Sequence, residues 1–149
     1  MLDRAEIRPD DTIVDVRTGP GLLVLEALGR IGPDGAVLAI DNSADYLEHL
    51  RTACDDPRVS YLVGGPDVLP LTDASVDVVL ADSVLADLPD AREAVRELFR
   101  VLRPGGRLSI FEAAEDGGEL ERTFTEAGFS ALDSEAAAPS GRFLAGRKP

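Results

Sequence analysis

Apolar and polar positions follow two different periods along the chain, and the two kinds of segment alternate. Short runs that are apolar throughout, or at every second position, predict strands. These strands are expected at 13–16, 36–40, 59–63, 76–81, 108–111, 129–132 and 142–145. Segments with apolar residues three and four positions apart predict helices. These are expected over 22–31, from a cap at Asn42 or Ser43 to Cys54, and over 91–102 and 120–127.

This alternation predicts a doubly wound α/β fold, a mostly parallel seven-stranded sheet with helices on both faces. The last two strands have only the short link Ala136–Gly141 between them, so we expect an antiparallel hairpin at one edge. The 149 residues, 44% of them hydrophobic, suit one domain over 1–149. Met1–Asp11 has room for one helical turn, and Ala113–Gly118 is too short for a lid. The domain is therefore expected to be minimal, without an N-terminal cap or lid.

The stretch Thr12–Asp41 organises the rest of the chain. Its first strand stops at Arg17-Thr18-Gly19-Pro20-Gly21, where glycines permit positive φ or close approach to the backbone. A helix that we expect to be buried on most sides follows, and the next strand ends on Asp41. In such a strand–helix–strand unit the helix N-terminus directs unpaired N–H groups at the crevice beyond the strand ends. A small polar ligand is expected there.

Charge narrows the possible partners. The formal net charge is −13 and the pI is near 4.3, so the field around the molecule disfavours nucleic acid and anionic lipid. Cys54 is the single cysteine, which excludes an intrachain disulfide and a zinc site built on several thiolates, and no metal is expected. No signal segment or membrane-length apolar run is present, so the sequence predicts a cytoplasmic protein. Eight acids against Arg122 between Glu112 and Glu135 predict a solvated face.

Four stretches carry a resemblance to a known family: Asp15–Gly21, Ala39–Asp41, Leu69–Val79 and Glu97–Leu108. In this order they resemble motifs of the class I S-adenosylmethionine-dependent methyltransferases. The first is similar to that family's acid and glycine turn, and the last contains a Leu-Arg-Pro-Gly-Gly phrase before the fifth strand. The resemblance covers Ile13 to Lys148. It implies a Rossmann-like fold, S-adenosylmethionine as the cofactor and methyl transfer to a small-molecule acceptor.

The resemblance also implies a cofactor site at the strand ends. Asp41 would accept hydrogen bonds from the two ribose hydroxyls, and Asp15 would orient the amine directly or through water. The backbone at Gly19 and Gly21 would lie against the methionyl part. The remaining expected contacts are Asn42, Gly65 and Pro66 near the adenine, and Ala81 and Asp82 beside the amine end.

Three positions depart from the family pattern, and one of them is Ala86, which stands where a histidine is common after the fourth strand. Arg17 stands where the family has its first glycine, and Gly65 stands where many members have an acid that binds the adenine amine. The Arg17 guanidinium would intrude on the methionyl pocket or else pair with the cofactor carboxylate. Alternatively, it would face solvent and pair with a local acid. The departures at Arg17 and Gly65 favour an alternative function, that of a non-catalytic binding or regulatory subunit. A nicotinamide-dependent oxidoreductase shares the strand–helix–strand unit, but the later motifs argue against it.

The acceptor is not identified by the sequence. His49, the only histidine, is expected to be exposed rather than to act as a base, so the catalytic residues stay unknown. Transfer to an already nucleophilic atom depends mainly on alignment and exclusion of water, and the chain alone offers little cover for that. We therefore expect a homo-oligomer or a partner subunit that completes the site.

Overall fold

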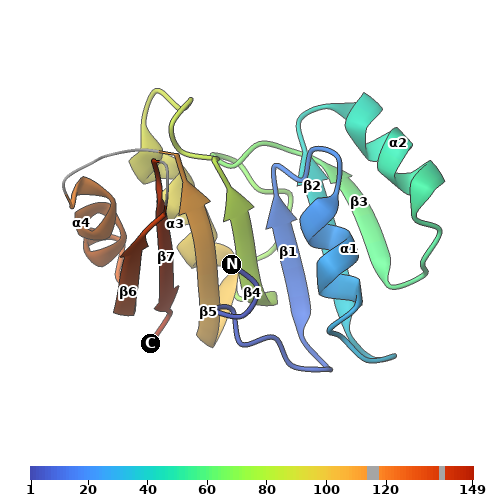
Figure 1. Cartoon of the computed structure of the whole chain (residues 1–149), viewed down its shortest axis with the longest axis horizontal. Helices are drawn as coiled ribbons and strands as arrows, with labels where there is room; N and C mark the ends of the chain where they lie inside the picture. Colours follow the sequence, from blue (N-terminus) through green and yellow to red (C-terminus); the bar gives the residue numbers. More distant parts are fainter. Residues whose placement is uncertain (114–117, 138–139) are drawn as a thin grey trace.

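The computed structural model describes residues 1–113, 118–137 and 140–149, and it forms one twisted sheet with helices on its two faces (Figure 1). The strands are β1 (Thr12–Val16), β2 (Ala36–Asp41), β3 (Val59–Val63), β4 (Val76–Asp82), β5 (Leu102–Glu112), β6 (Ser130–Ala136) and β7 (Arg142–Arg147). The helices are α1 (Leu22–Leu28), α2 (Ala44–Ala53), α3 (Ala91–Val101) and α4 (Glu119–Glu126). Strands and helices alternate as the sequence pattern predicts.

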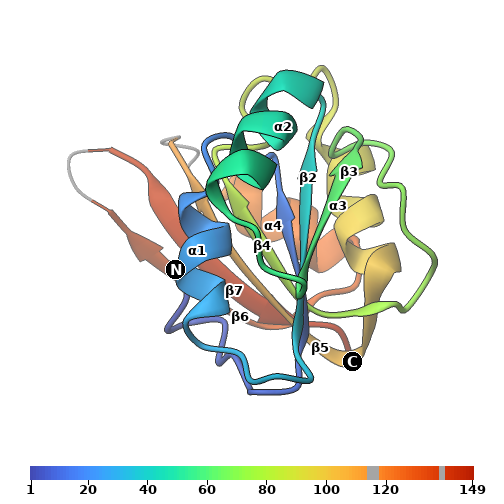
Figure 2. The same ribbon diagram turned by 90° about the vertical axis from the view of Figure 1, so that its right-hand side faces the viewer.

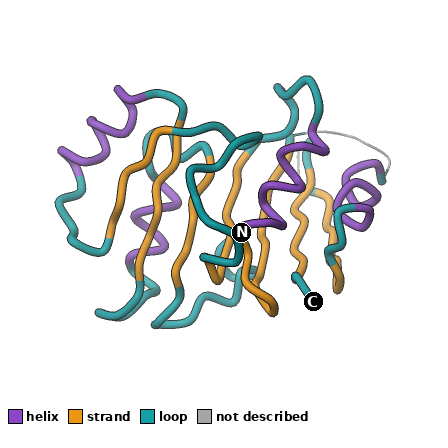
Figure 3. Tube along the Cα trace, turned by 180° about the vertical axis from the view of Figure 1, so that it is seen from behind, coloured by secondary structure: helices purple, strands orange, loops and turns teal. Residues whose placement is uncertain are grey.

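The seven strands lie in the order β3-β2-β1-β4-β5-β7-β6. The first five strands in the chain pair in parallel, whereas β7 is antiparallel to both β5 and β6. Seen from behind, the strands cross the molecule as one continuous layer (Figure 3). The doubly wound α/β prediction is confirmed, including the antiparallel hairpin at one edge.

Each face of the sheet has its own hydrophobic core, because successive strand residues point to opposite faces. On one face Ile13 packs with buried residues of α1, α2 and the N-terminal turn. On the other face Val14 and Val16 pack with α3 and α4. Figure 2 shows α1 and α3 on opposite sides of the strands. Packing in these two cores fixes the positions of the strand ends, and the site described below lies at those ends.

Helix α1 differs from its prediction in two ways. It ends at Leu28, with Gly29 as its C-cap, instead of reaching Ile31. It is also not buried on most sides, because Leu22 is 69% exposed and Leu25 is 48% exposed. Only Val24 and Ala27 are buried in this helix. A short helix that packs on a sheet buries only the residues of one face. Its other apolar residues remain exposed to solvent.

Strand β5 also differs, since it begins directly after α3 at Leu102 and not at Leu108. Its pairing with β4 is irregular, because Val76 lies opposite Leu102 whereas Val78 lies opposite Arg107. The extra residues include Gly105, whose φ is +77°. The helix therefore ends at Val101, before the Pro-Gly-Gly stretch that was predicted to end it, and that stretch lies inside β5.

Two predictions from the sequence fall wholly or partly on residues 114–117 and 138–139. Residues 114–117 of the segment Ala113–Gly118, which was expected to be too short for a lid, lie outside the described residues. So do residues 138–139 of the link Ala136–Gly141. The N-terminal residues form turns, and Leu2 and Ala5 are buried against the sheet. No helix within the described ranges is long and apolar enough to cross a membrane.

Candidate functional site

The candidate site lies at the carboxyl ends of the parallel strands, where loops from β1, β2, β4 and β5 meet. Asp41 is the last residue of β2, and its side chain is only 4% exposed. Its Oδ2 accepts the backbone N–H of Gly19 at 2.9 Å, and its Oδ1 accepts that of Ser43 at 2.9 Å. Each carboxylate oxygen can accept more than one hydrogen bond, so two positions remain for a pair of ligand hydroxyls.

The glycine turn after β1 provides the space beside Asp41. Gly19 and Gly21 have φ values of +50° and +84°, a region that favours glycine. A Cβ atom built on Gly21 would lie 2.3 Å from Cδ1 of Leu50, so the turn also packs closely against α2. A Cβ on Gly19 would find its nearest neighbour, the Arg17 carbonyl oxygen, at 4.0 Å. The backbone at Gly19 is thus open to a ligand.

Asp15 lies one residue before the end of β1 and is 1% exposed. The Thr18 hydroxyl donates to its Oδ2 at 2.6 Å. Burial raises the pKa of Asp15 to about 7, the Thr18 hydrogen bond opposes this, and the charges of Asp82 and Asp41 add to it. A cation placed among these carboxyls would therefore be stabilised and would favour the ionised form of Asp15.

Arg17 takes the solvent-facing alternative. Its φ is +64°, so it has kept the backbone conformation that a glycine would adopt more easily. Its guanidinium donates to the carbonyl oxygen of Ser83 at 3.0 Å and pairs with Asp87 at 3.1 Å. It therefore links the turn after β1 to the turn after β4. The side chain thus points to this local acid, which was one of the two alternatives from the sequence.

The other predicted contacts lie along the same edge. Ala81 is buried at the end of β4, and Asp82 follows it with an exposed side chain. Asn42 is exposed beside Asp41, and the Gly64 backbone N–H donates to the Asp41 carbonyl oxygen at 3.0 Å. That bond brings the next turn, with Gly65 and the buried Pro66, to the same place. The structure thus gathers all ten predicted residues at one edge, with Arg17 turned outward.

Two residues of this edge were not predicted as site residues. One is Thr18, which lies in the quoted motif and is the hydrogen-bond donor to Asp15. The other is Glu112, which was predicted to lie on a solvated face because of the excess of acids between Glu112 and Glu135. That assignment is wrong for Glu112, because it is 2% exposed. It ends an apolar strand just as Asp41 does, and this shared position was the available signal. His49 is exposed, as expected.

The charge of this edge favours a positively charged ligand. Burial is the main cause that raises the pKa of both Asp15 and Glu112, and the charge of Asp82 adds a smaller contribution in the same direction. No group of three metal-ligating side chains is found within the part of the chain that the structure describes. A sulfonium and an ammonium would suit these carboxyls, whereas a dinucleotide pyrophosphate would be repelled. The residues present therefore fit S-adenosylmethionine better than a nicotinamide cofactor.

Comparisons with known proteins agree with this fit. Residues 14–110 match the family model described as "Methyltransferase domain". An uncharacterised 37.1 kDa protein in a transposon of Streptomyces fradiae is 37% identical over 113 residues, covering 75% of this chain and 33% of that protein. A ubiquinone/menaquinone biosynthesis C-methyltransferase of Hahella chejuensis is 29% identical over 136 residues, covering 88% and 55%. The chain thus spans between a third and about half of these relatives.

The fold has close structural neighbours. A chain of the complex between the Haloferax volcanii Trm112 methyltransferase activator and a methyltransferase superposes with a TM-score of 0.88. That superposition covers 99% of this chain and 86% of the other, at 22% sequence identity. With the family model matched over most of the sheet, the glycine turn and the acid that ends β2, the chain belongs to the class I S-adenosylmethionine-dependent methyltransferases.

Proposed function

We propose that this chain transfers the methyl group of S-adenosylmethionine to a small-molecule acceptor. The observation that carries the proposal is the buried Asp41 carboxylate, held by the N–H groups of Gly19 and Ser43 beside an open glycine turn. In the proposed complex Asp41 accepts both ribose hydroxyls. The Gly19 backbone lies against the methionyl part, and Asn42, Gly65 and Pro66 surround the adenine.

The amine end of the cofactor is assigned to Asp15, Ala81 and Asp82. Asp15 is buried and its one described side-chain hydrogen bond comes from Thr18, so its charge is not neutralised by a basic side chain there. An ammonium group beside it would supply that neutralisation. The cofactor itself supplies an electrophilic methyl on a sulfonium. The chain contributes alignment of that methyl with the acceptor, and no general base is needed for an already nucleophilic acceptor atom.

A small acceptor is supported by charge and by the relatives. A net charge of −13 disfavours a nucleic-acid substrate. The Hahella relative is named for a step in ubiquinone and menaquinone biosynthesis. The non-catalytic alternative is not favoured, because Asp41 and the glycine turn keep their geometry and Arg17 leaves the methionyl region free.

The test is calorimetric titration with S-adenosylhomocysteine, which shares every group of the cofactor except the methyl. Wild-type protein is expected to bind it with micromolar affinity. Asp41→Ala removes two charge-assisted hydrogen bonds, and the affinity should fall by roughly tenfold to a hundredfold. Asp34→Ala is the matched control, because it removes an exposed acid from a turn at the opposite end of the strands. Absence of heat and of thermal stabilisation at millimolar ligand would overturn the proposal.

We also propose that a second copy of the chain covers part of this site. Leu22 and Leu25 are exposed at the start of α1, next to the glycine turn. The neighbour solved with Trm112 is itself part of a complex. Light scattering should report a dimer for the wild type and a monomer for the double variant Leu22→Ser, Leu25→Ser. A monomeric wild type that transfers methyl groups would contradict this arrangement.

A further inference from the structure

Glu112 is the last residue of β5, and only one of its two carboxyl oxygens accepts hydrogen bonds. Its Oε1 accepts the backbone N–H groups of Val84 at 2.8 Å and Leu85 at 2.9 Å. Its Oε2 is buried and has no hydrogen-bond partner among the described residues, since the nearby Ala86 backbone N–H favours the ionised carboxyl but makes no hydrogen bond of acceptable geometry to it. A buried polar atom without a partner costs free energy, and such atoms in native proteins call for an explanation. A ligand that donates a hydrogen bond to Oε2 would provide one.

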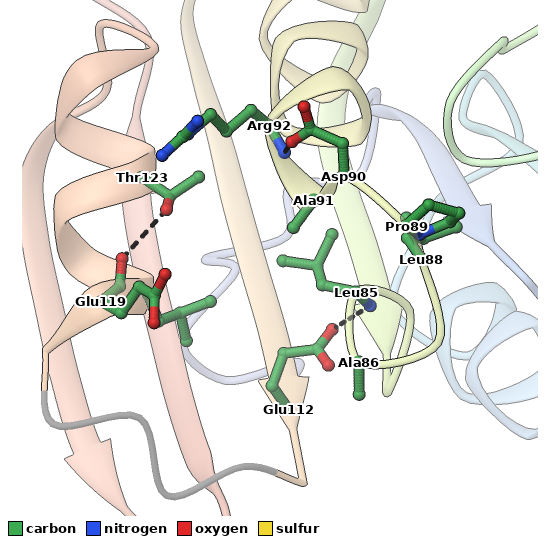
Figure 4. A pocket seen from close by; sticks show the side chains of 11 residues that line it. Leu85, Ala86, Leu88, Pro89, Asp90, Ala91, Arg92, Glu112, Glu119 and Thr123 are labelled. Carbon is green, nitrogen blue, oxygen red and sulfur yellow. Dashed lines mark hydrogen bonds between the residues drawn. The ribbon is translucent and has the colours of Figure 1, made fainter.

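Glu112 lines a pocket of about 560 Å³ between the turn after β4, the start of α3 and the start of α4 (Figure 4). The apolar lining includes Leu85, Leu88, Pro89 and Leu120. In Figure 4 the Glu112 carboxyl lies beside Leu85 and Ala86, with the leucine side chain reaching toward α3. Ligand pockets have volumes of about 300 to 1,000 Å³. This pocket combines its apolar side chains with the polar side chains of Asp90, Arg92, Glu119 and Thr123.

The pocket adjoins the proposed cofactor site. Asp82 of β4 lies opposite Phe111 of β5, so Glu112 is one residue beyond the proposed amine contact on the next strand. Neighbouring strands are only about 4.8 Å apart. The turn from Ser83 to Ala86 separates the two sites, and Glu112 holds that turn through its Oε1. The turn therefore stands between an occupant of the pocket and the proposed amine contact Asp82, which lines the hollow on the other face, and the methyl-accepting atom of the occupant must extend past this turn.

A second hollow, of about 770 Å³, opens on the other face of the sheet and includes Asp82 and Phe111. Its carboxylates at Asp82 and Glu26 are exposed to solvent, unlike that of Glu112. Its arginines are already paired, Arg4 with Asp133 and Glu135, and Arg30 with Asp3. Within the described residues, none of the side-chain atoms that are buried without a partner belongs to this hollow. The observations therefore favour the Glu112 pocket.

We propose that this pocket binds the methyl acceptor, a neutral or cationic molecule with an apolar ring and a hydroxyl or amine that donates to Oε2 of Glu112. The inference rests on the proposed methyl transfer and names its acceptor class. Besides Glu112, the lining carries Asp90 and Glu119 against the single charge of Arg92, so an anionic acceptor is disfavoured. Asp90 is partly committed, because it caps α3 by accepting the Arg92 backbone N–H.

The test uses three probes of one shape and different charge: phenol, benzylamine and benzoate. Each is titrated into the full chain, and methyl NMR signals of Leu85, Leu88 and Leu120 are followed. Phenol and benzylamine should shift these signals at millimolar concentration, and benzoate should not. Shifts at Leu2 and Leu23 instead would assign binding to the second hollow and overturn the proposal.

The variant Glu112→Gln should reverse the preference. Because two N–H groups occupy Oε1, the glutamine must place its carbonyl oxygen there and present its NH₂ to the pocket. Phenol should then bind about tenfold more weakly, the effect of losing a hydrogen bond to a charged group, while benzoate gains affinity. A purely structural role for Glu112 would lower the affinity for all probes alike, and an unchanged ratio of phenol to benzoate affinity would overturn the proposal.

Two further variants complete the design. Glu126→Gln makes the same change of charge on α4, outside the pocket lining, and should leave the phenol affinity unchanged. If Glu112→Gln does not fold, Ala86→Phe fills the pocket from an exposed turn position and should abolish the leucine shifts. If the leucine methyl signals of the wild type shift but S-adenosylhomocysteine does not bind, the proposed methyl transfer is refuted and ligand binding in the pocket is not. If S-adenosylhomocysteine binds but the leucine signals do not shift, only the proposed binding in the pocket is refuted.

Discussion

The two ends of the sheet treat buried acids differently. At the amino end of the strands, Asp11 is paired with Arg107 at 2.5 Å, and both side chains are buried. Asp77 accepts the Thr12 backbone N–H at 2.8 Å and pairs with Arg103 at 2.7 Å. Asp11 and Asp77 therefore each have a cationic partner at this end, and their charges are balanced there.

At the carboxyl end the acids lack such partners. Asp15, Asp41 and Glu112 accept hydrogen bonds from a hydroxyl or from backbone N–H groups. In the described ranges no lysine or arginine forms an ion pair with any of the three. The same residue type thus stabilises the fold at one end and keeps uncompensated charge at the other. Stability and binding can be changed separately if this contrast is right.

The largest expected effect is on the balanced end. Asp11→Ala leaves the Arg107 guanidinium buried and unpaired, and removing one partner of a buried ion pair costs about 3 to 5 kcal/mol of unfolding free energy. Urea unfolding followed by circular dichroism measures this. The affinity of the remaining folded protein for S-adenosylhomocysteine should not change.

Two controls separate burial from charge. Asp3→Ala breaks an exposed pair with Arg30, whose charges are screened by solvent, and should leave the unfolding free energy almost unchanged. The double variant Asp11→Leu, Arg107→Met replaces both buried charges with apolar groups and should recover most of the stability. A double variant as unstable as Asp11→Ala would show that packing, not the unpaired charge, causes the loss.

At the unbalanced end, stability should depend on pH through Asp15. Its pKa is raised by burial to about 7 in the folded state, whereas the unfolded value is near 3.8. The folded protein therefore holds this proton more tightly. The stabilising contribution is complete below about pH 4 and is lost as the pH rises to about 7. Asp15→Asn should remove this loss and be more stable than wild type at pH 8, by on the order of 2 to 4 kcal/mol. Urea unfolding of both proteins at pH 5 and pH 8 checks the sign.

Cofactor affinity should change in the opposite direction with pH. The ligand ammonium favours ionised Asp15, and the ionised fraction grows by about tenfold between pH 6 and pH 8 for a pKa of about 7. The affinity for S-adenosylhomocysteine should rise by up to this factor, as measured by calorimetry at both values. Asp15→Asn should bind weakly with a flat profile. A flat profile in the wild type would place the amine away from Asp15.

Much of this arrangement follows from local sequence patterns. The order of strands and helices, the glycine turn and the acid that ends β2 are all visible in short stretches, because each depends on hydrophobic period and backbone freedom. The parallel sheet then follows from the alternation, since crossover connections bring the carboxyl ends of the strands to one edge. Asp15 and Asp41 could therefore be assigned to that edge from sequence.

Burial and pairing across long separations could not be predicted in this way. Glu112 begins an acid-rich stretch, and only the turn after β4, 27 and 28 residues earlier, makes it a buried acceptor. The exposed outer face of α1 has the same cause, because an apolar helix reveals its covered side only when its neighbours are placed. Arg17 shows the point most clearly, since its partner Asp87 lies 70 residues away.

Arg17 also provides the smallest expected effect, and it tests whether its backbone or its ion pair matters. Arg17→Gly removes a side chain from a φ of +64° and should stabilise the fold by up to about 1 kcal/mol. Asp87→Ala breaks the same exposed ion pair without changing that φ, so it should alter the unfolding free energy by less than about 0.5 kcal/mol. Thermal unfolding of both variants measures the difference. If both lose equal stability, the ion pair outweighs the backbone strain, and the link from the turn after β1 to the turn after β4 supports the fold instead of merely filling a position that glycine would suit better.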